Sequence, residues 1–332
     1  MRRIWLCCMV AGMFATPSIG AVVSPLLVKA YRDGAVARVQ GCVVDEKGIP
    51  LSNAFVRVLF RSINQRRDDA ELSVWTDGEG LFELAHRTNW KIECHIMKDG
   101  YYDSNYEISF YDAERAIVKD GLWTIPDEMN RRIVLRKILS EKALFVFPEG
   151  KRMGTWRIPL TNEWVGFDFE YFDWVKPYGK GKWTDMLLRF SSETRGHIRG
   201  RYQMEVSFTN NPYAGAYRGS ADKISDLKIP HRADMSKDYV NYYCFLRDTI
   251  GDVRKDTFPG PNDYLVFRTR TQTDAEGFLA SAHYGVISGT WISSETVMRM
   301  DDAAFNPVEN DADIEDGYYL RYLLRRYEQQ HR

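Results

Sequence analysis

The chain has 332 residues, with 45 Lys and Arg against 46 Asp and Glu. This near-neutral balance does not indicate a polyanion partner such as nucleic acid. Aromatic residues make up 14% of the chain and charged residues 27%, a composition that excludes a disordered protein. The length suits two domains, at roughly 100–200 residues per domain.

The first twenty residues have the pattern of a secretory signal peptide. Arg2 and Arg3 form a positive start, and the apolar stretch of residues 4–14 that follows is too short to span a bilayer. Small residues at positions 18 and 20 suit cleavage before Ala21. We expect residues 1–20 to be removed and the protein to be exported to the periplasm or cell surface, without a transmembrane segment after cleavage. A retained N-terminal anchor is the alternative.

Residues 35–136 show short alternating strands joined by tight turns. Val39, Gly41 and Val43 alternate before a turn at residues 45–48, and residues 54–60 carry apolar side chains on both faces. A second turn at residues 77–80, where glycine supplies positive φ, predicts a hairpin. Further strands follow at residues 92–96 and 131–137.

The string V-x-G-x-V-x-D…G-x-P-L-x-x-A-x-V…T-D-x-x-G-x-F…x-G-Y in this region resembles the carboxypeptidase regulatory-like domain, a transthyretin-like β-sandwich. The resemblance implies seven or so strands in two sheets. It implies no enzymatic activity and no active-site residue, since in that family the module is a folding aid, spacer or docking unit. The residues that carry it are Val39, Gly41, Val43, Asp45, Gly48, Pro50, Leu51, Ala54, Val56, Thr76, Asp77, Gly80, Phe82, Gly100 and Tyr101.

Residues 140–332 predict a second β-rich domain after a linker near residues 139–152, which contains the turn signal Pro-Glu-Gly. Spacing of two from Val165 to Tyr171 predicts a half-buried strand, with Asp168 and Glu170 on its wet face. A short helix is predicted at residues 317–330, with attachment to a membrane surface as the alternative. Other strands are expected at residues 186–190, 202–208, 264–273 and 279–290.

The second domain is similar to C-terminal regions of uncharacterised secreted bacterial proteins that carry the same N-terminal module. The similarity lies in Val-Gly-Phe-Asp-Phe at 165–169, Asp-Trp-Val at 173–175 and Pro-Tyr-Gly-Lys-Gly at 177–181. It implies a setting and no mechanism. The expected fold class is therefore all-β: a transthyretin-like β-sandwich at residues 35–136, followed by a β-rich, sandwich-like domain of unknown function at residues 140–332 with a short C-terminal helix.

Three cysteines remain after signal cleavage: Cys42, Cys94 and Cys244. Alternation places Cys42 and Cys94 on different faces of their strands, which argues against a disulfide between them. Cys94 shares its face with Ile92 and Ile96 and is expected in the core. We expect three unpaired thiols, with an oxidised pair as the alternative, and their spacing fits no metal site.

No catalytic or cofactor-binding motif is present in the sequence, and we expect no cofactor. The alternating carboxylates Asp311, Asp313 and Glu315 could present oxygen ligands to a cation such as Ca²⁺. They fail the EF-hand frame because Asp316 occupies the glycine position. A solvated loop is the preferred interpretation, so we expect no metal.

Four residues of the second domain are candidates for a glycan site. Asp168 and Glu170 could serve as paired carboxylates for glycoside hydrolysis, which needs two carboxyl groups held roughly 5–9.5 Å apart. Trp164 and Trp174 flank them and could stack on sugar rings. Acidic residues on a wet strand face and aromatic residues in a dense β core are the alternatives.

Three functional hypotheses follow. The preferred one is a secreted, non-catalytic binding or envelope-structural protein of unknown ligand. The second is a secreted glycan-active hydrolase or carbohydrate-binding protein with its site in the second domain. The third is an envelope protein that docks on a membrane complex through an exposed apolar patch. The possible partners are accordingly a glycan or an envelope protein.

Overall fold

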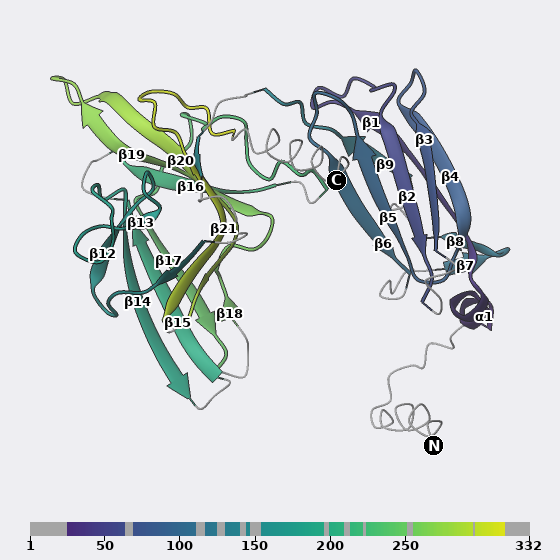
Figure 1. Ribbon diagram of the computed structural model, residues 1–332, viewed down its shortest axis with the longest axis horizontal. Coiled ribbons are helices and arrows are strands. Elements are labelled where there is room, and N and C mark those ends of the chain that lie inside the picture. The colour runs from purple at the N-terminus through teal and green to yellow at the C-terminus, as the bar shows by residue number, and fades with distance from the viewer. Residues whose placement is uncertain are drawn as a thin grey trace, which may run out of the picture.

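The computed structural model describes the two predicted domains but not the predicted signal peptide or C-terminal helix, which lie outside the described residues. Figure 1 shows two groups of strands connected by irregular segments. The described residues are 25–63, 69–110, 117–124, 130–139, 144–146, 154–195, 199–208, 213–221, 224–250, 255–294 and 296–315.

The first domain is a sandwich of two sheets, preceded by helix α1 (Pro25–Asp33). One sheet has the order β4-β1-β8-β7, with β9 paired in parallel to β1, and the other has the order β3-β2-β5-β6. The strands are β1 (Ala35–Val44), β2 (Phe55–Arg61), β3 (Ala70–Trp75), β4 (Leu81–Thr88), β5 (Lys91–Met97), β6 (Ser104–Ser109), β7 (Ile117–Lys119), β8 (Leu122–Thr124) and β9 (Asn130–Val134).

Strand alternation places the core of the first domain between these two sheets. Val39 and Val43 of β1 point into it, as do Val56 and Val58 of β2, and all four are completely buried. Cys94 is also buried, as predicted, and the three cysteines of the described residues are unpaired. Helix α1, which the sequence patterns did not predict, contacts this core through three of its residues, Leu27, Ala30 and Tyr31.

Three turns use the same aspartate-to-glycine chemistry. In each, the aspartate Oδ1 accepts hydrogen bonds from the amides two and four residues later, at 2.8–3.0 Å. The glycine three residues after each aspartate has φ between 74° and 88°, which disfavours any side chain there. The turns begin at Asp45, Asp77 and Asp274. The Asp77 turn connects β3 to β4, which pair in different sheets, so the hairpin predicted there is wrong.

The second domain is also a sandwich of two sheets, each with six strands among the described residues. One has the order β10-β21-β20-β19-β16, with β11 paired to β21, and the other the order β13-β12-β14-β15-β17-β18. The strands are β10 (Phe145–Val146), β11 (Gly154–Arg157), β12 (Trp164–Asp168), β13 (Asp173–Trp174), β14 (Met186–Arg195), β15 (Arg199–Ser207), β16 (Gly215–Ser220), β17 (Tyr242–Asp248), β18 (Lys255–Asp256), β19 (Asp263–Thr273), β20 (Leu279–Ser293) and β21 (Val297–Phe305).

The sheet that contains β19, β20 and β21 is buried on both faces. Leu265 and Phe267 of β19 face the opposing sheet, whereas Val266 between them belongs to a separate apolar cluster on the outer face. Residues 224–240 and 306–315 cover that outer face. The same cluster includes Tyr102 of the first domain, so covering this sheet also joins the two domains.

The structure confirms the all-β fold class and corrects several local predictions. Strand β12 ends at Asp168 because residues 169–172 form a turn, so the predicted strand to Tyr171 was too long. Strand β10 lies within the predicted linker and pairs with β21. Strand β6 was not predicted, since its polar outward residues and buried Tyr106 gave no clear apolar alternation. Within the described residues, no helix has the length and apolar character needed to cross a membrane.

Replacement of Phe167 by alanine should strongly destabilise the second domain. Phe167 is completely buried and makes edge-on contacts with Trp156, Phe169 and Trp174. We expect a loss of about 3–5 kcal/mol in the free energy of unfolding, because the cavity cannot collapse. Chemical denaturation followed by tryptophan fluorescence measures it. Phe278→Ala, at a ring that is 66% exposed, is the control and should change stability by less than about 0.5 kcal/mol.

Candidate functional site

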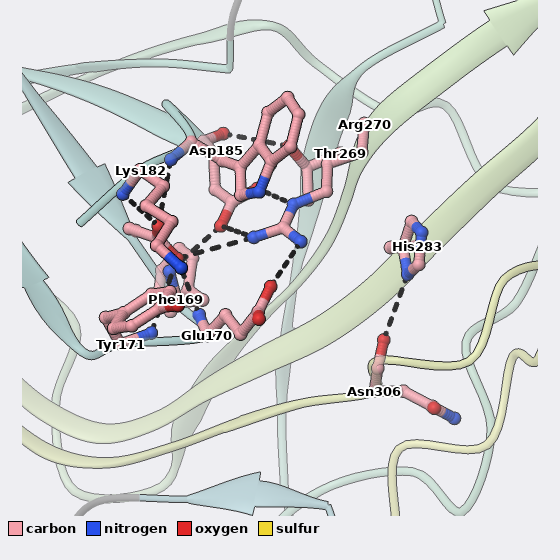
Figure 2. Close-up of polar contacts among 11 residues, drawn as sticks. Phe169, Glu170, Tyr171, Lys182, Asp185, Thr269, Arg270, His283 and Asn306 are labelled. Atoms are coloured by element: carbon pink, nitrogen blue, oxygen red, sulfur yellow. Dashed lines mark hydrogen bonds and ion pairs between the residues drawn. The ribbon is translucent and has the colours of Figure 1, made fainter. Parts of the chain in front are cut away.

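The predicted carboxylates of the second domain converge on one guanidinium, that of Arg270 (Figure 2). Arg270 lies in β19 where the pairing with β20 shifts register, and its φ is +49°. A non-glycine residue in this left-handed region is strained, and such strain persists only where the surroundings fix it. Its guanidinium also lies between the buried ring of Phe305, at 4.8 Å, and the exposed ring of Trp183, at 5.7 Å.

Asp168 is completely buried and holds two loops together through backbone amides. Its Oδ1 accepts from the amides of Glu170 at 2.9 Å and Tyr171 at 3.3 Å. Its Oδ2 accepts from the amides of Lys182 at 2.7 Å and Trp183 at 2.9 Å. The sequence prediction placed this carboxylate on a wet strand face, which is wrong, because it serves as the acceptor for a turn at the end of β12.

Asp185 is the second completely buried carboxylate, and no sequence pattern indicated it. Its Oδ1 accepts from Arg270 Nε at 2.8 Å, and its Oδ2 accepts from Arg270 Nη2 at 3.0 Å. The same Oδ2 accepts from the amide of Phe169 at 2.9 Å. Burial raises the pKa of the Asp185 carboxyl, and the contact with Arg270 opposes that rise. Glu170, the partly exposed third carboxylate, pairs with Arg270 Nη1 at 2.8 Å.

Aromatic rings with a cation against them surround this ion cluster. Trp183 is 58% exposed above Arg270, and Tyr171 is 37% exposed with the ammonium of Lys182 at 4.9 Å from its ring centre. The hydrogen bond and charge interaction with Tyr171 raise the pKa of Lys182, which therefore stays protonated. We call Tyr171 and Trp183 the aromatic rim. A cation against a ring restrains the ring and leaves the rest of its surface to solvent.

The two tryptophans singled out in the sequence lie in different environments. Trp174 is buried in the core and donates from Nε1 to the carbonyl of Arg157 at 2.9 Å, so it cannot reach a ligand. Trp164 is 39% exposed on the outer face of β12, with the guanidinium of Arg189 at 4.8 Å. Arg189 in turn forms a two-point ion pair with Glu205, at 3.1 and 2.5 Å.

The predicted cation candidates do not come together. Asp311 and Asp313 accept from the backbone amides two residues later, at 3.1 Å in each case. Glu315 is completely buried and contacts Tyr102 and His231 instead. Within the part of the chain that the structure describes, no group of three or more His, Cys, Asp or Glu side chains is placed to hold a metal ion.

The first domain has a depression of about 540 Å³ on the outer face of the sheet containing β2 and β5. Two of its carboxylates are paired: Glu93 with Arg61 and Lys91, and Glu107 with Lys91. This pairing is typical of a solvated charged surface. The side chains around the depression include Arg57, Leu59, Glu71, Glu93, His95, Asn105 and Glu107.

Three of the residues that build the ion cluster were missed from the sequence: Asp185, Arg270 and Trp183. Arg270 reaches Asp185 across 85 residues of chain and Asp168 across 102, so no local spacing could have indicated these contacts. A charged residue within an otherwise alternating strand is the single local signal at Arg270.

The chain matches no protein-family model and no curated protein. Solved structures match part of it. The 3-chlorocatechol 1,2-dioxygenase of Rhodococcus opacus 1CP is 15% identical, with a TM-score of 0.26 over 32% of this chain and 61% of that one. The catechol 1,2-dioxygenase of Acinetobacter sp. ADP1 is 17% identical, with a TM-score of 0.25 over 32% and 54%. The chain thus spans under two thirds of those enzymes, and such distant matches have no bearing on its function.

Replacement of Arg270 by methionine should strongly destabilise the second domain, because it leaves two buried carboxylates without their counter-charge. We expect a loss of about 3–5 kcal/mol in the free energy of unfolding at pH 7. The difference from the unmodified protein should shrink towards pH 4, since burial raises the pKa of Asp185 and protonation removes the unpaired charge. Chemical denaturation at several pH values measures both effects.

The matched control is Arg201→Met, which breaks ion pairs of a half-exposed guanidinium with Asp248 and Glu193. This change should cost less than about 1 kcal/mol. Equal losses in the free energy of unfolding for the two variants would contradict a special role for the Arg270 cluster.

Proposed function

We propose that the chain is an exported, non-catalytic binding protein, and that carbohydrate is the ligand class for which its second domain is best suited. The observation that carries this proposal is the combination of fully engaged carboxylates with exposed, cation-restrained aromatic rings at one place. Export rests on the signal-peptide pattern of residues 1–20.

The engaged carboxylates argue against the hydrolase hypothesis. A glycosidase needs one carboxyl group that can protonate the leaving oxygen and a second that can reach the sugar or a water molecule. Asp168 and Asp185 are completely buried, and their oxygens accept hydrogen bonds from backbone amides and Arg270. Glu170 shares that guanidinium. These groups therefore stabilise irregular backbone and position the rim.

The exposed rings support the binding role. The face of a sugar ring that carries C–H groups is apolar and packs against an aromatic face, while its hydroxyl groups need polar partners at the edge. Trp183 and Tyr171 supply such rings, and the half-exposed Glu170 and exposed Lys182 supply polar groups beside them. Trp164, with Arg189 and Glu205, repeats this combination of an exposed ring, a cation and a carboxylate on the outer face of the sheet that contains β12.

The first domain is proposed to be a carboxypeptidase regulatory-like module that acts as a spacer or docking unit. The residues that carry the resemblance have structural roles in this domain. Thr76, for example, is buried, donates from Oγ1 to the carbonyl of Leu51 at 2.7 Å and accepts from the amide of Ala54 at 2.9 Å. Asp45 and Asp77 accept hydrogen bonds from backbone amides within their turns. The motif thus supports a fold assignment without implying a ligand.

The first test is a glycan array probed with the mature protein, followed by calorimetric titration with the strongest ligand. Trp183→Ala should weaken that binding at least about tenfold, which corresponds to about 1.4 kcal/mol, because the stacking surface is lost. Trp75→Ala is the matched control, since Trp75 is 61% exposed on the first domain. The affinity of Trp75→Ala for the glycan should equal that of the unmodified protein.

Two results would contradict the proposal. Release of reducing ends from the bound glycan would show catalysis. Absence of saturable binding of the folded, unmodified protein to every glycan would exclude carbohydrate and leave an envelope protein as the partner.

A further inference from the structure

The two domains meet along a polar junction as well as through the outer apolar cluster. Asn105 of β6 donates its backbone amide to the carbonyl of Ile224 at 2.7 Å, and its side chain donates to Asp226 Oδ1 at 2.8 Å. The amide of Asp226 donates to the carbonyl of Asp103 at 2.9 Å. The two main-chain bonds do not change with pH, so they set a constant background for the titratable contacts nearby. The Asp226 carboxyl is one such titratable group, and burial raises its pKa.

His231 lies at this junction with a carboxylate at each ring nitrogen. Its Nδ1 is 2.6 Å from Glu315 Oε2 of the second domain, and its Nε2 is 3.2 Å from Glu46 Oε2 of the first. Only an imidazolium can donate from both nitrogens at once. Glu315 is completely buried and also accepts from the Tyr102 hydroxyl at 2.7 Å and the amide of Leu139 at 3.0 Å.

Arg136 is the other cation that faces this group among the described residues. It donates from Nε to Glu46 Oε1 at 3.0 Å and from Nη1 to the carbonyls of Leu227 and Ile229, at 3.2 and 2.5 Å. Arg136 belongs to the first domain and stays charged at every relevant pH. Its hydrogen bonds across the junction therefore persist whether or not His231 is protonated.

His95 lies near the same junction but has different partners at its ring nitrogens. Its Nδ1 faces Arg57 Nη2 at 3.2 Å, and its Nε2 faces Asp103 Oδ2 at 3.1 Å. Since the guanidinium can only donate, Nδ1 must accept, and Nε2 donates to the carboxylate. His95 thus faces one cation and one carboxylate where His231 faces two carboxylates, so it serves as an internal comparison for His231.

We propose that His231, which lies between Glu46 and Glu315, strengthens the contact between the two domains when it is protonated. Mildly acidic pH therefore stabilises the contact between the domains, and alkaline pH weakens it. Loss of the proton removes one donor and leaves a carboxylate facing a nitrogen lone pair across the domain boundary.

The pH window follows from the direction of each shift. Burial lowers the pKa of His231, and so does the charge of Arg136. The hydrogen bond and charge of Glu315, together with the hydrogen bond of Glu46, raise it more, to above its ordinary 6.5. The stabilisation is therefore complete below about pH 6.5 and is lost as pH rises through the folded-state pKa. Despite burial, the hydrogen bonds of Glu315 and Glu46 hold the pKa of each carboxyl below its usual range, so their contribution persists down to acid pH.

The test compares thermal unfolding of the mature protein with that of His231→Gln between pH 5.5 and pH 8.5. The difference in Tm should be largest at pH 5.5 and should shrink as the pH rises through the pKa of His231. His95→Gln is the matched control near the same junction. Its Tm difference should grow less towards pH 5.5, because one of its ring nitrogens faces a guanidinium and not a second carboxylate. In ¹⁵N-edited NMR of the histidine rings, the signals lost in His231→Gln should show both nitrogens protonated at pH 6.

A Tm difference for His231→Gln that is independent of pH would overturn the proposal. So would a neutral His231 ring at pH 6 in the unmodified protein. If the variant fails to fold, sequential resonance assignment of the unmodified protein identifies this ring.

Discussion

The structure depends on the burial of both faces of the sheet that contains β19, β20 and β21. One face packs against the opposing sheet of the second domain, and the other needs an apolar cover of its own. That cover comes from residues 224–240 and 306–315, which bring the side chains Leu227, Ile229 and Ile314 onto the sheet. Because these segments also contact the first domain, the position of the two domains follows from the need to cover one sheet.

Buried carboxylates have a consistent structural role in this protein. Asp168 and Asp185 hold loops and a strained strand residue in the second domain, and Glu315 holds the domain junction. Each is engaged by backbone amides and by a cation or a hydroxyl group, which is how a buried charge avoids the cost of lost hydration. Their placement organises the backbone, and in the second domain it positions the exposed rings of Tyr171 and Trp183.

Much of the fold was predictable because strand alternation and turn chemistry act over a few residues. The strands around Val39, Val56 and Ile92, the turn at Asp77, the hairpin at Asp274, and the long strands β14, β15, β19 and β20 were all indicated by local pattern. The predicted hairpin at Asp77 was wrong because the strands on either side of the turn pair in different sheets, which no local pattern shows. The strand predicted from Val165 to Tyr171 was too long, since the alternation of apolar residues continues into a turn that Asp168 stabilises. The candidate site was found only in part: Asp168 and Glu170 were named, but not the arginine that unites them.

The sequence by itself determined the class of fold, the two domains' alternating cores and the tight turns, since each depends on neighbours within a few positions. The tertiary structure alone decided which polar groups meet. Arg270 joins Asp185 across 85 residues, and His231 joins Glu46 across 185. It also decided that Trp174 is core and Trp183 is surface, because burial depends on which sheet packs above a residue, and no local spacing encodes that.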